Sequence, residues 1–341
     1  MSEKAHEDKK IYTAAVIGCG RIGLLSEKDV RRAKPATHCG GFTMHPRIRL
    51  AAVADTDPAK QEEARQMLPG VEVFSSAEEM LENVHPDIVS IATPHAKHYD
   101  GVLLAAERGV PLIMCEKPIA ETTEEAERMI NAARNAGSIL LVNHMRRFDP
   151  VLQDVARMIK DKEIGEMQVA RCVYVNGLFN TGSHLIDFLR LCLGEVIWVS
   201  AYPSPKIHSD TDMLVDAIIN FENDVMVSMQ ALDSKHYAVF EIDFFGTKNV
   251  LSVKGLGQTV EMKNLRDSNQ YVSYKEPDEN HPVKIAGEGR SFFSGMTDHI
   301  VSCLDGDAKP LSTGEDALAA LRVLLAIKES AQSDGKKIFL T

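Results

Sequence analysis

The sequence predicts a two-part α/β chain, in which a doubly wound parallel sheet is followed by an α+β domain with an open, mainly antiparallel sheet. Three observations lead to this fold class. Short apolar runs alternate with helical patterns in the first part, a glycine-rich turn follows the first run, and longer alternating strands follow residue 150. We place the domains at 11–148 and 149–341, with the last helix able to pack back on the first domain.

Length, charge and cysteine content narrow the class of protein. A chain of 341 residues is long enough for two domains. The formal net charge of −11 argues against nucleic acid as a partner, because phosphate binding needs a basic surface. No apolar run reaches the ~20 residues of a membrane span, and the N-terminus is too charged for a signal peptide. The 6 scattered cysteines lack metal-ligand spacing, so we expect a cytoplasmic protein without a metal site.

A glycine-rich turn follows the first buried strand, which we expect at 14–17. The glycines have the G-x-G-x-x-G spacing. Gly18 permits a tight turn, Gly20 lets a pyrophosphate approach the backbone, and Gly23 lets the next helix pack closely. The N–H groups at the start of that helix favour an anion. The residues expected to contact the cofactor here are Gly18, Gly20, Arg21, Ile22 and Gly23.

A second buried strand, expected at 49–54, is followed by Asp55. A carboxylate at this place accepts hydrogen bonds from the ribose hydroxyls and repels a 2′-phosphate, so the sequence predicts NAD in preference to NADP. Asp55 lies 32 residues after Gly23, whereas about 20 is usual. We therefore expect an insertion, at 24–40.

The insertion carries more basic than acidic side chains, and two interpretations of its arginines stay open. A charged run is usually a solvated surface loop. A loop that leaves a phosphate-binding turn also lies beside the cofactor crevice, where Arg31, Arg32 or Lys34 can meet an anionic substrate.

The rest of the first domain continues the alternation of strand and helix. We expect helices at 37–45, 58–68, 76–81, 98–109 and 122–136, and strands at 71–74, 87–93, 111–115 and 138–143. Right-handed crossovers bring the carboxyl ends of parallel strands to one edge of the sheet. The glycine turn, Thr93-Pro94-His95 and Glu116-Lys117-Pro118 are therefore expected along the same edge.

The pattern changes after Pro150. We expect helices at 151–160 and 180–192, strands at 166–175, 197–202, 214–221, 225–232 and 238–245, a polar and irregular stretch with a hairpin and a loop at 256–290, and closing helices at 291–304 and 313–333. Alternating strands joined by hairpins predict an open antiparallel sheet with helices on one face.

Three further motifs, taken together, resemble those of one enzyme family. They are Glu116-Lys117-Pro118, the run Asn-His-Met-Arg-Arg-Phe-Asp-Pro at 143–150, and the run Thr-Gly-Ser-His-Leu-Ile-Asp at 181–187. With the glycine turn, they make nearly the whole chain similar to the glucose–fructose oxidoreductase/inositol dehydrogenase (Gfo/Idh/MocA) family. The resemblance implies a dinucleotide-binding Rossmann domain and a substrate and oligomerisation domain. It also implies NAD(P)-dependent oxidation or reduction of sugars and related alcohols, by homodimers or homotetramers paired through the open face of the second sheet.

Within that family, the inserted loop and the string 180–184 are most similar to the nucleotide-sugar 3-dehydrogenases. The likeness implies a small-molecule substrate that is oxidised at C3, of the UDP-N-acetylhexosamine type. Two alternatives stay open: an inositol, polyol or dihydrodiol dehydrogenase of the same family, and a non-catalytic NAD-binding regulator. A regulator has no need of both Lys117 and His184, which argues against the last.

Oxidising a secondary alcohol needs a base for the hydroxyl proton and a cation for the developing alkoxide. His184 is the expected base and Lys117 the expected cation, although a desolvated lysine can itself be the base. Asn180 stands where many family members carry Asp; it can hydrogen-bond the substrate or His184 but brings no charge. On a regular helix, Asn180, His184 and Asp187 share one face.

The resemblance also implies contacts with the nicotinamide half of the cofactor. The residues concerned are Thr93, Pro94, His95, His98, Glu116 and Lys117, and helix capping is the alternative for His98. The remaining substrate candidates are Arg146, Arg147 and Asp187. Interdomain salt bridges account for the two arginines nearly as well, and a helix-surface acid for Asp187.

Overall fold

The computed structural model describes residues 10–204, 212–287 and 289–340. The chain divides into two compact units, each built from two separate parts of the sequence. The first unit runs to Asn143 and includes Ser291–Gly314, and the second comprises His144–Arg290 and the segment from Glu315 on. The domain bounds 11–148 and 149–341 stay a prediction.

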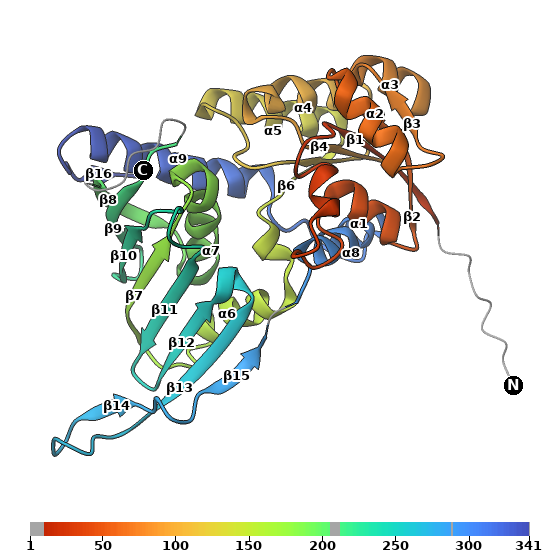
Figure 1. Ribbon diagram of the computed structural model, residues 1–341. Coiled ribbons are helices and arrows are strands. Elements are labelled where there is room, and N and C mark those ends of the chain that lie inside the picture. Colours follow the sequence, from red (N-terminus) through yellow and green to blue (C-terminus); the bar gives the residue numbers. More distant parts are fainter. Residues whose placement is uncertain (1–9, 205–211, 288, 341) are drawn as a thin grey trace, which may run out of the picture. The chain divides into compact units, whose positions relative to one another are not determined.

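Parallel strands form the sheet of the first unit (Figure 1). The strands are β1 (Tyr12–Ile17), β2 (Ile48–Ala54), β3 (Glu72–Phe74), β4 (Ile88–Ile91), β5 (Leu112–Cys115) and β6 (Ile139–Val142). Their order is β3-β2-β1-β4-β5-β6, and each neighbouring pair is parallel. The central strands are buried on both faces, as their apolar runs require. The predicted doubly wound sheet is confirmed, and its strand order reverses between β1 and β4.

Side-chain caps define the start of most helices in this unit. The helices are α1 (His38–Met44), α2 (Pro58–Met67), α3 (Ala77–Val84), α4 (His98–Glu107) and α5 (Thr123–Ala136). The side chains of Thr37, Asp57, Ser76 and Thr122 each accept a hydrogen bond from a first-turn N–H. α5 ends at Gly137, whose φ of 72° is left-handed.

A helix from late in the sequence, α8 (Phe292–Asp305), belongs to the first unit and packs beside α1 (Figure 1). The Phe293 ring meets the His38 ring edge-on at 5.2 Å between centroids. At the other end of α8, the Tyr12 hydroxyl donates to Asp305 at 2.7 Å. The helix is thereby fixed to both α1 and β1.

The described residues of the second unit contain a ten-stranded sheet. Its strands are β7 (Met167–Tyr174), β8 (Val196–Pro203), β9 (Val215–Phe221), β10 (Met226–Ala231), β11 (Phe240–Gly246), β12 (Asn249–Lys254), β13 (Thr259–Asp267), β14 (Lys275–Pro277), β15 (Val283–Ala286) and β16 (Ile338–Phe339). The order is β14-β13-β12-β11-β7-β10-β9-β8-β16, with β15 paired to β13. Among the described strands of this sheet, only β7 and β10 pair in parallel. The predicted open, mainly antiparallel sheet is confirmed.

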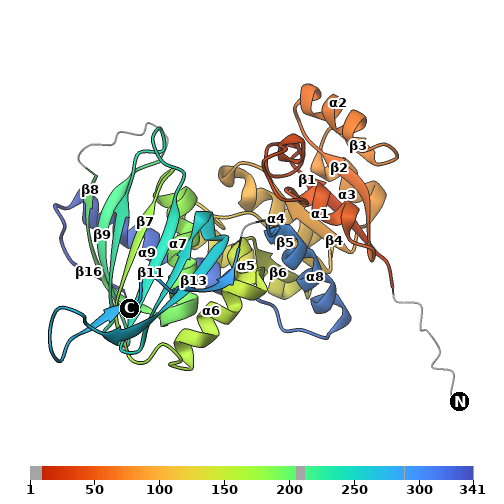
Figure 2. The same cartoon turned by 60° about the horizontal axis from the view of Figure 1, so that its bottom comes forward.

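Helices lie on one face of this sheet, as Figures 1 and 2 show. They are α6 (Pro150–Lys160), α7 (Ser183–Leu193) and α9 (Gly314–Gln332). On the strands, buried and exposed side chains alternate, and Val169 on β7 and Ile218 on β9 are 40% and 39% exposed. No helix in the described ranges is both long and apolar enough to cross a bilayer.

The stretch 256–290 is more regular than the sequence indicated. It contains β13, in which residues 259–264 pair with β12 and residues 265–267 pair with the short strand β14, and a second short strand, β15. Val260 is the one residue of β13 that is fully buried, so the strand lacks the apolar alternation by which it could be recognised. The expected hairpin is present as the antiparallel pair β13 and β14, while the expectation that the stretch is otherwise irregular is wrong for β13.

Candidate active site

The glycine turn has the geometry that its spacing predicts. Gly18 has φ 99°, and a Cβ there would lie 2.7 Å from the carbonyl oxygen of Ala92. A Cβ at Gly23 would overlap the carbonyl oxygen of Gly18. A Cβ at Gly20, in contrast, would meet no atom of the described residues within 4 Å. Gly18 and Gly23 are therefore required by packing, while Gly20 faces open space where a pyrophosphate fits.

Asp55 connects the glycine turn to the next strand end. Its Oδ2 accepts from the backbone N–H of Cys19 at 2.8 Å, and its Oδ1 accepts from that of Asp57 at 2.9 Å. The Lys60 ammonium lies 3.9 Å from the same carboxylate. Asp55 thus holds the turn in place, and its position after β2 suits hydrogen bonds to a ribose.

A pocket of about 680 Å³ opens at the carboxyl edge of the parallel sheet. The predicted cofactor residues that line it are Gly18, Gly20, Arg21, Ile22, Asp55, Thr93 and Pro94. The Thr93 hydroxyl oxygen is buried and has no hydrogen-bond partner among the described residues. An unsatisfied hydroxyl, a bare glycine backbone and a ribose-binding acid fit NAD, which Arg21, Asp55 and Thr93 would hold.

Sequence reasoning missed several polar residues of this pocket. They are Lys60, Ser76, Glu78, Lys97 and Asp100. All lie at or near the starts of α2, α3 and α4, which follow the carboxyl ends of β2, β3 and β4. The rule that ligands bind outside the carboxyl ends of parallel strands could have found them.

His95 and His98 lie near Thr93 but have different surroundings. His95 is exposed, and its Nε2 lies 3.2 Å from the Glu121 carboxylate. His98 is buried, with its two ring nitrogens 2.8 Å from the Pro118 carbonyl oxygen and 3.0 Å from that of Thr93. Burial lowers the pKa of His98 despite these two bonds. His98 thus connects the loop after β4 to the loop after β5. Cofactor contacts by His95 and His98 stay predictions.

The insertion interrupts the helix that follows the glycine turn. The backbone N–H groups of His38 and Cys39 donate to the carbonyl oxygens of Ile22 and Gly23, at 3.1 and 3.0 Å. In an uninterrupted helix those carbonyls accept from residues 26 and 27, so the chain leaves the helical ladder for about 12 residues and then rejoins it. If these inserted residues are left out of the count, Asp55 follows Gly23 by the usual distance of about 20 residues. The excursion is therefore shorter than the expected 24–40, because α1 resumes at His38.

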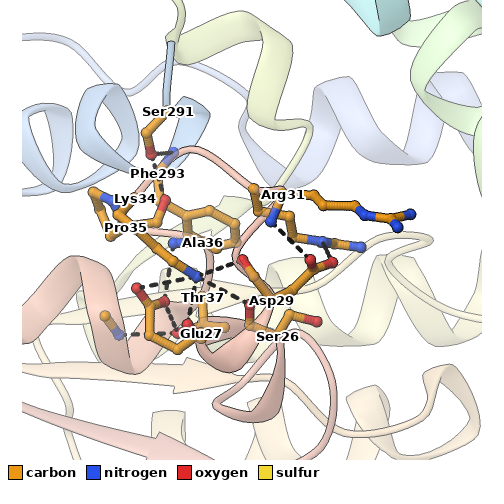
Figure 3. A network of polar contacts seen from close by, with 12 residues as sticks. Ser26, Glu27, Asp29, Arg31, Lys34, Pro35, Ala36, Thr37, Ser291 and Phe293 are labelled. Carbon is orange, nitrogen blue, oxygen red and sulfur yellow. Dashed lines mark hydrogen bonds and ion pairs between the residues drawn. The ribbon is translucent and has the colours of Figure 1, made fainter. Parts of the chain in front are cut away.

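The exposed Lys34 side chain bridges backbone carbonyls of the inserted loop (Figure 3). Its ammonium donates to the carbonyl oxygens of Ser26, Glu27 and Asp29. The Glu27 carboxylate accepts from the Ala36 N–H at 2.9 Å and from the Thr37 hydroxyl at 2.8 Å. Lys34, one of the basic residues predicted to meet a substrate, is therefore already hydrogen-bonded to the backbone of its own loop.

The two arginines of the loop lie near its exposed tip. Arg32 donates to Asp29 at 3.3 Å. Arg31 is exposed, and Figure 3 shows its guanidinium extending away from the Lys34 contacts. Neighbouring Val30 is 92% exposed. The loop thus has a polar interior and a basic tip, and substrate binding by Arg31 and Arg32 stays a prediction.

Lys117 follows β5, on the edge that carries the pocket. Ile17, Ile91 and Cys115 are in register on the neighbouring strands β1, β4 and β5. Gly18, Thr93 and Lys117 come one or two residues later, so they follow strand ends on the same edge. Glu116 is buried and its carboxylate lies 2.8 Å from His38 Nε2. Its predicted cofactor contact stays a prediction.

In the second unit, His184 lies in the first turn of α7 and is buried, while Asn180 is exposed in the preceding π-helical turn, Leu178–Gly182. The wider π turn breaks the regular spacing on which a shared face of Asn180, His184 and Asp187 was predicted. The Asp212 carboxylate accepts from the backbone N–H groups of Phe179 and Asn180, at 3.2 and 2.8 Å. Asp212 was not predicted, because it is distant in sequence from the turn that it holds.

Asp187 and Arg147 form a buried ion pair. Arg147 Nε donates to both Asp187 oxygens, at 3.0 and 2.9 Å, and Asp187 is 1% exposed. Arg147 also pairs with Asp316 at 3.0 Å, and His144 Nδ1 lies 3.5 Å from Asp187. Although burial opposes it, the Asp187 charge raises the pKa of Arg147. These contacts stabilise the fold around α7, and substrate contacts by the pair stay predictions.

Arg146 also lies inside the second unit. Its guanidinium stacks over the Phe240 ring at 3.7 Å and donates to the Leu256 carbonyl oxygen at 3.2 Å. Burial lowers its pKa to about 10. A substrate role for Arg146 stays a prediction. Among the described residues, no group of three or more His, Cys, Asp or Glu side chains could hold a metal ion.

Comparison with known proteins agrees with this architecture. The profile described as "Oxidoreductase family, NAD-binding Rossmann fold" matches residues 12–144. The profile described as "Oxidoreductase family, C-terminal alpha/beta domain" matches residues 177–339. Both profiles describe the Gfo/Idh/MocA family, and together they cover most of the chain.

Individual relatives match this chain over only part of its length. D-glucoside 3-dehydrogenase of Escherichia coli (strain K12) is 28% identical over 204 residues, 56% of this chain and 55% of the relative. Inositol 2-dehydrogenase of Arthrobacter sp. (strain FB24) is 34% identical over 195 residues, 54% of each chain. The matched region thus spans about half the length of these curated relatives.

A solved structure shares the fold over nearly the full length. The WlbA dehydrogenase from Bordetella pertussis, in complex with NADH and UDP-GlcNAcA, superposes with a TM-score of 0.77 at 24% identity, covering 98% of this chain and 99% of WlbA. The parallel sheet, the glycine turn, the pocket at its edge and both profile matches lead to one conclusion. This chain belongs to the Gfo/Idh/MocA family of NAD-binding oxidoreductases.

Proposed function

We propose that this chain is a dehydrogenase that transfers hydride between a secondary alcohol of a sugar and NAD, and we favour C3 of a UDP-N-acetylhexosamine-type nucleotide sugar as the reacting carbon. One observation carries the proposal. Lys117 follows a strand end in register with the strand ends before Gly18 and Thr93, two residues that line the pocket fitted to NAD. A cation on that edge supports a role for Lys117 in stabilising the alkoxide that forms when an alcohol is oxidised.

The residues divide the chemistry between them. Bound NAD would supply the hydride acceptor, held by the glycine turn, Asp55 and Thr93. In this proposal Lys117 stabilises the alkoxide as a point charge. His184, at the start of α7, removes the hydroxyl proton, and Asn180 hydrogen-bonds the substrate without adding charge.

The inserted loop favours an anionic substrate. Its interior is fixed by Lys34 and Glu27, so Arg31 and Arg32 are presented on a preformed scaffold instead of a mobile tail. Arginine suits the oxygens of a diphosphate because its planar donors pair with them two at a time. The WlbA complex with UDP-GlcNAcA, a protein of the same fold, gives further support for a nucleotide sugar.

A second candidate substrate is a free sugar or inositol. The inositol 2-dehydrogenase relative, at 34% identity, and the D-glucoside 3-dehydrogenase relative favour it. Neither substrate requires an arginine-bearing loop. Measuring the rate of NADH formation with UDP-N-acetyl sugars, free sugars and inositols distinguishes the candidates. Turnover confined to UDP-sugars supports the nucleotide-sugar proposal, and turnover confined to free sugars or inositols contradicts it.

Self-association is part of the proposal. The face of the second sheet that carries Val169 and Ile218 presents apolar side chains to solvent, and strands of one copy can cover those of another. Sedimentation equilibrium of the full chain tests this. We expect a dimer or tetramer, whereas a monomer at micromolar concentration would contradict it.

A further inference from the structure

The turn that precedes α7 is wider than an α-helical turn, and it is joined to another segment of the chain. The Gly182 N–H donates to the carbonyl oxygen of Gly177 at 3.0 Å, five residues earlier, whereas an α-helix makes this bond to the fourth residue before. The Leu178 N–H donates to the Met213 carbonyl oxygen at 2.8 Å. The π turn, Leu178–Gly182, is therefore attached at its first residue to the segment that leads into β9.

The Asp212 side chain holds the next two residues of the π turn. Its Oδ1 accepts from the Phe179 N–H at 3.2 Å, and its Oδ2 accepts from the Asn180 N–H at 2.8 Å. The first N–H groups of a helix have no partner within it, and here one carboxylate satisfies two of them. The carboxylate also lies against Gly177, where φ is 93° and a Cβ would be 2.2 Å from Asp212 Oδ2. An alanine at Gly177 would therefore displace Asp212.

Asn180 has an exposed side chain on a backbone that is held from both sides. Its N–H donates to Asp212, and its carbonyl oxygen accepts from the Ser183 hydroxyl at 2.7 Å. A side chain on a fixed backbone loses less conformational freedom when it binds a ligand. Closing the π turn to α-helical spacing would move Asn180 by one residue position, about 100° around the helix axis. The direction of the Asn180 side chain thus depends on the π turn.

We propose that Asp212 is a positioning residue, which fixes the π turn so that the Asn180 side chain is directed at the substrate. The inference rests on the proposed function, in which Asn180 hydrogen-bonds the sugar without adding charge. Asp212 acts through the backbone of the turn. It is not among the described residues that line the NAD pocket, so the Kd of NAD should not depend on it.

The first test measures amide hydrogen exchange in the full-length protein without substrate, by mass spectrometry resolved to single residues. It compares wild type with Asp212→Ala and Asp212→Asn. Asp278→Ala is the matched control, because Asp278 accepts from the Asn280 N–H at 3.2 Å, in the loop between β14 and β15 of the same unit. In Asp212→Ala we expect exchange at Phe179 and Asn180 to be at least about ten-fold faster.

The other two variants should behave differently from Asp212→Ala. Asp278→Ala should leave exchange in the π turn unchanged. Asp212→Asn should keep protection at one of the two amides, because its single amide oxygen can still accept from one N–H. Gly177→Ala, which displaces the carboxylate without removing it, should reproduce the fast exchange of Asp212→Ala. Wild-type exchange in Asp212→Ala overturns the inference. If Asp212→Ala does not fold, Asp212→Asn and Gly177→Ala carry the same test.

The second test is a double-mutant cycle on turnover. NADH formation is measured for Asp212→Ala, Asn180→Ala and the double variant, with whichever UDP-N-acetyl sugar, free sugar or inositol the wild type oxidises. We expect each single variant to lower kcat/KM by at least about ten-fold, mainly through a higher KM, because a hydrogen bond to the bound sugar is lost. The double variant should match the slower single variant within about two-fold, since both changes remove the same contact.

The outcomes separate a positioning role from a general loss of stability. Effects that multiply in the double variant show that Asp212 does not act through Asn180, and they overturn the inference. A Kd of NAD that rises more than about three-fold in Asp212→Ala also overturns it. A wild-type protein that oxidises no alcohol, beside fast exchange in Asp212→Ala, contradicts the proposed function and supports the hold of Asp212 on the π turn.

Discussion

The backbone N–H of His38 donates to the carbonyl oxygen of Ile22 at 3.1 Å, the bond that residue 26 makes in an uninterrupted helix. The glycine turn and α1 therefore belong to one helical ladder, and the loop between them is an addition to it. The loop has its own polar interior, in which Lys34 and Glu27 take part (Figure 3). This separation allows the NAD site and the loop to be changed independently.

Deleting residues 26–37, so that Leu25 is followed by His38, should leave the NAD site intact. The ladder bond from His38 to Ile22 closes without the loop. We expect the Kd of NAD to change by less than about three-fold, while kcat/KM for a UDP-sugar falls at least about ten-fold through the loss of Arg31 and Arg32. Isothermal titration and steady-state rates measure both. Unchanged kcat/KM for a UDP-sugar would rule out the loop as a substrate site.

Lys34→Met should loosen the loop while keeping most of the side-chain volume. The Lys34 ammonium donates to three backbone carbonyls, which the thioether cannot replace. We expect cleavage by a protease within the loop to be faster and the free energy of unfolding to fall by about 1 kcal/mol. Lys28→Met is the control, since Lys28 pairs only with exposed Glu63 in the described structure. Equal cleavage of the two variants would show that Lys34 does not hold the loop.

Gly20→Ala should weaken NAD binding, whereas Gly23→Ala should destabilise the fold. A methyl group at Gly20 enters open space, so the protein should fold normally and lose NAD affinity by about ten-fold or more. A methyl group at Gly23 overlaps the Gly18 carbonyl, so the free energy of unfolding should fall by about 3 kcal/mol. Thermal unfolding and NAD titration separate the two effects. A Gly20→Ala protein with wild-type affinity would argue against pyrophosphate binding at this turn.

Asp55→Asn should weaken the preference for NAD over NADP. The amide oxygen can still accept from the Cys19 N–H and so hold the glycine turn, while the Asp57 N–H loses its acceptor and the charge that repels a 2′-phosphate is gone. Lys60 lies 3.9 Å from both Asp55 and Asp57, so in this variant it has one carboxylate fewer to pair with and can meet the phosphate. We expect the ratio of the two dissociation constants to shift toward NADP by about ten-fold or more. Asp57→Asn is the control, and an equal shift in both variants would contradict the role of Asp55.

The sequence predicted those features that depend on residues close together in the chain. The glycine spacing and the apolar runs predicted the parallel sheet, and the distance from Gly23 to Asp55 revealed the insertion. It could not predict contacts between side chains that are far apart in the chain. His38 and Glu116 are far apart in the chain, and their contact depends on α1 rejoining its ladder. The π turn before His184 depends on Asp212, so a regular helical spacing could not predict which side chains share its face.

Lys117→Met tests the central claim most directly. NADH formation is followed by its near-ultraviolet absorbance with a UDP-N-acetylhexosamine and NAD, beside a titration of NAD binding to the same protein. We predict that the variant binds NAD with a Kd within about three-fold of wild type and that kcat falls by at least about a thousand-fold, because the alkoxide loses its cation. Turnover at the wild-type rate, with NAD bound, would contradict the assignment of Lys117 to the chemistry.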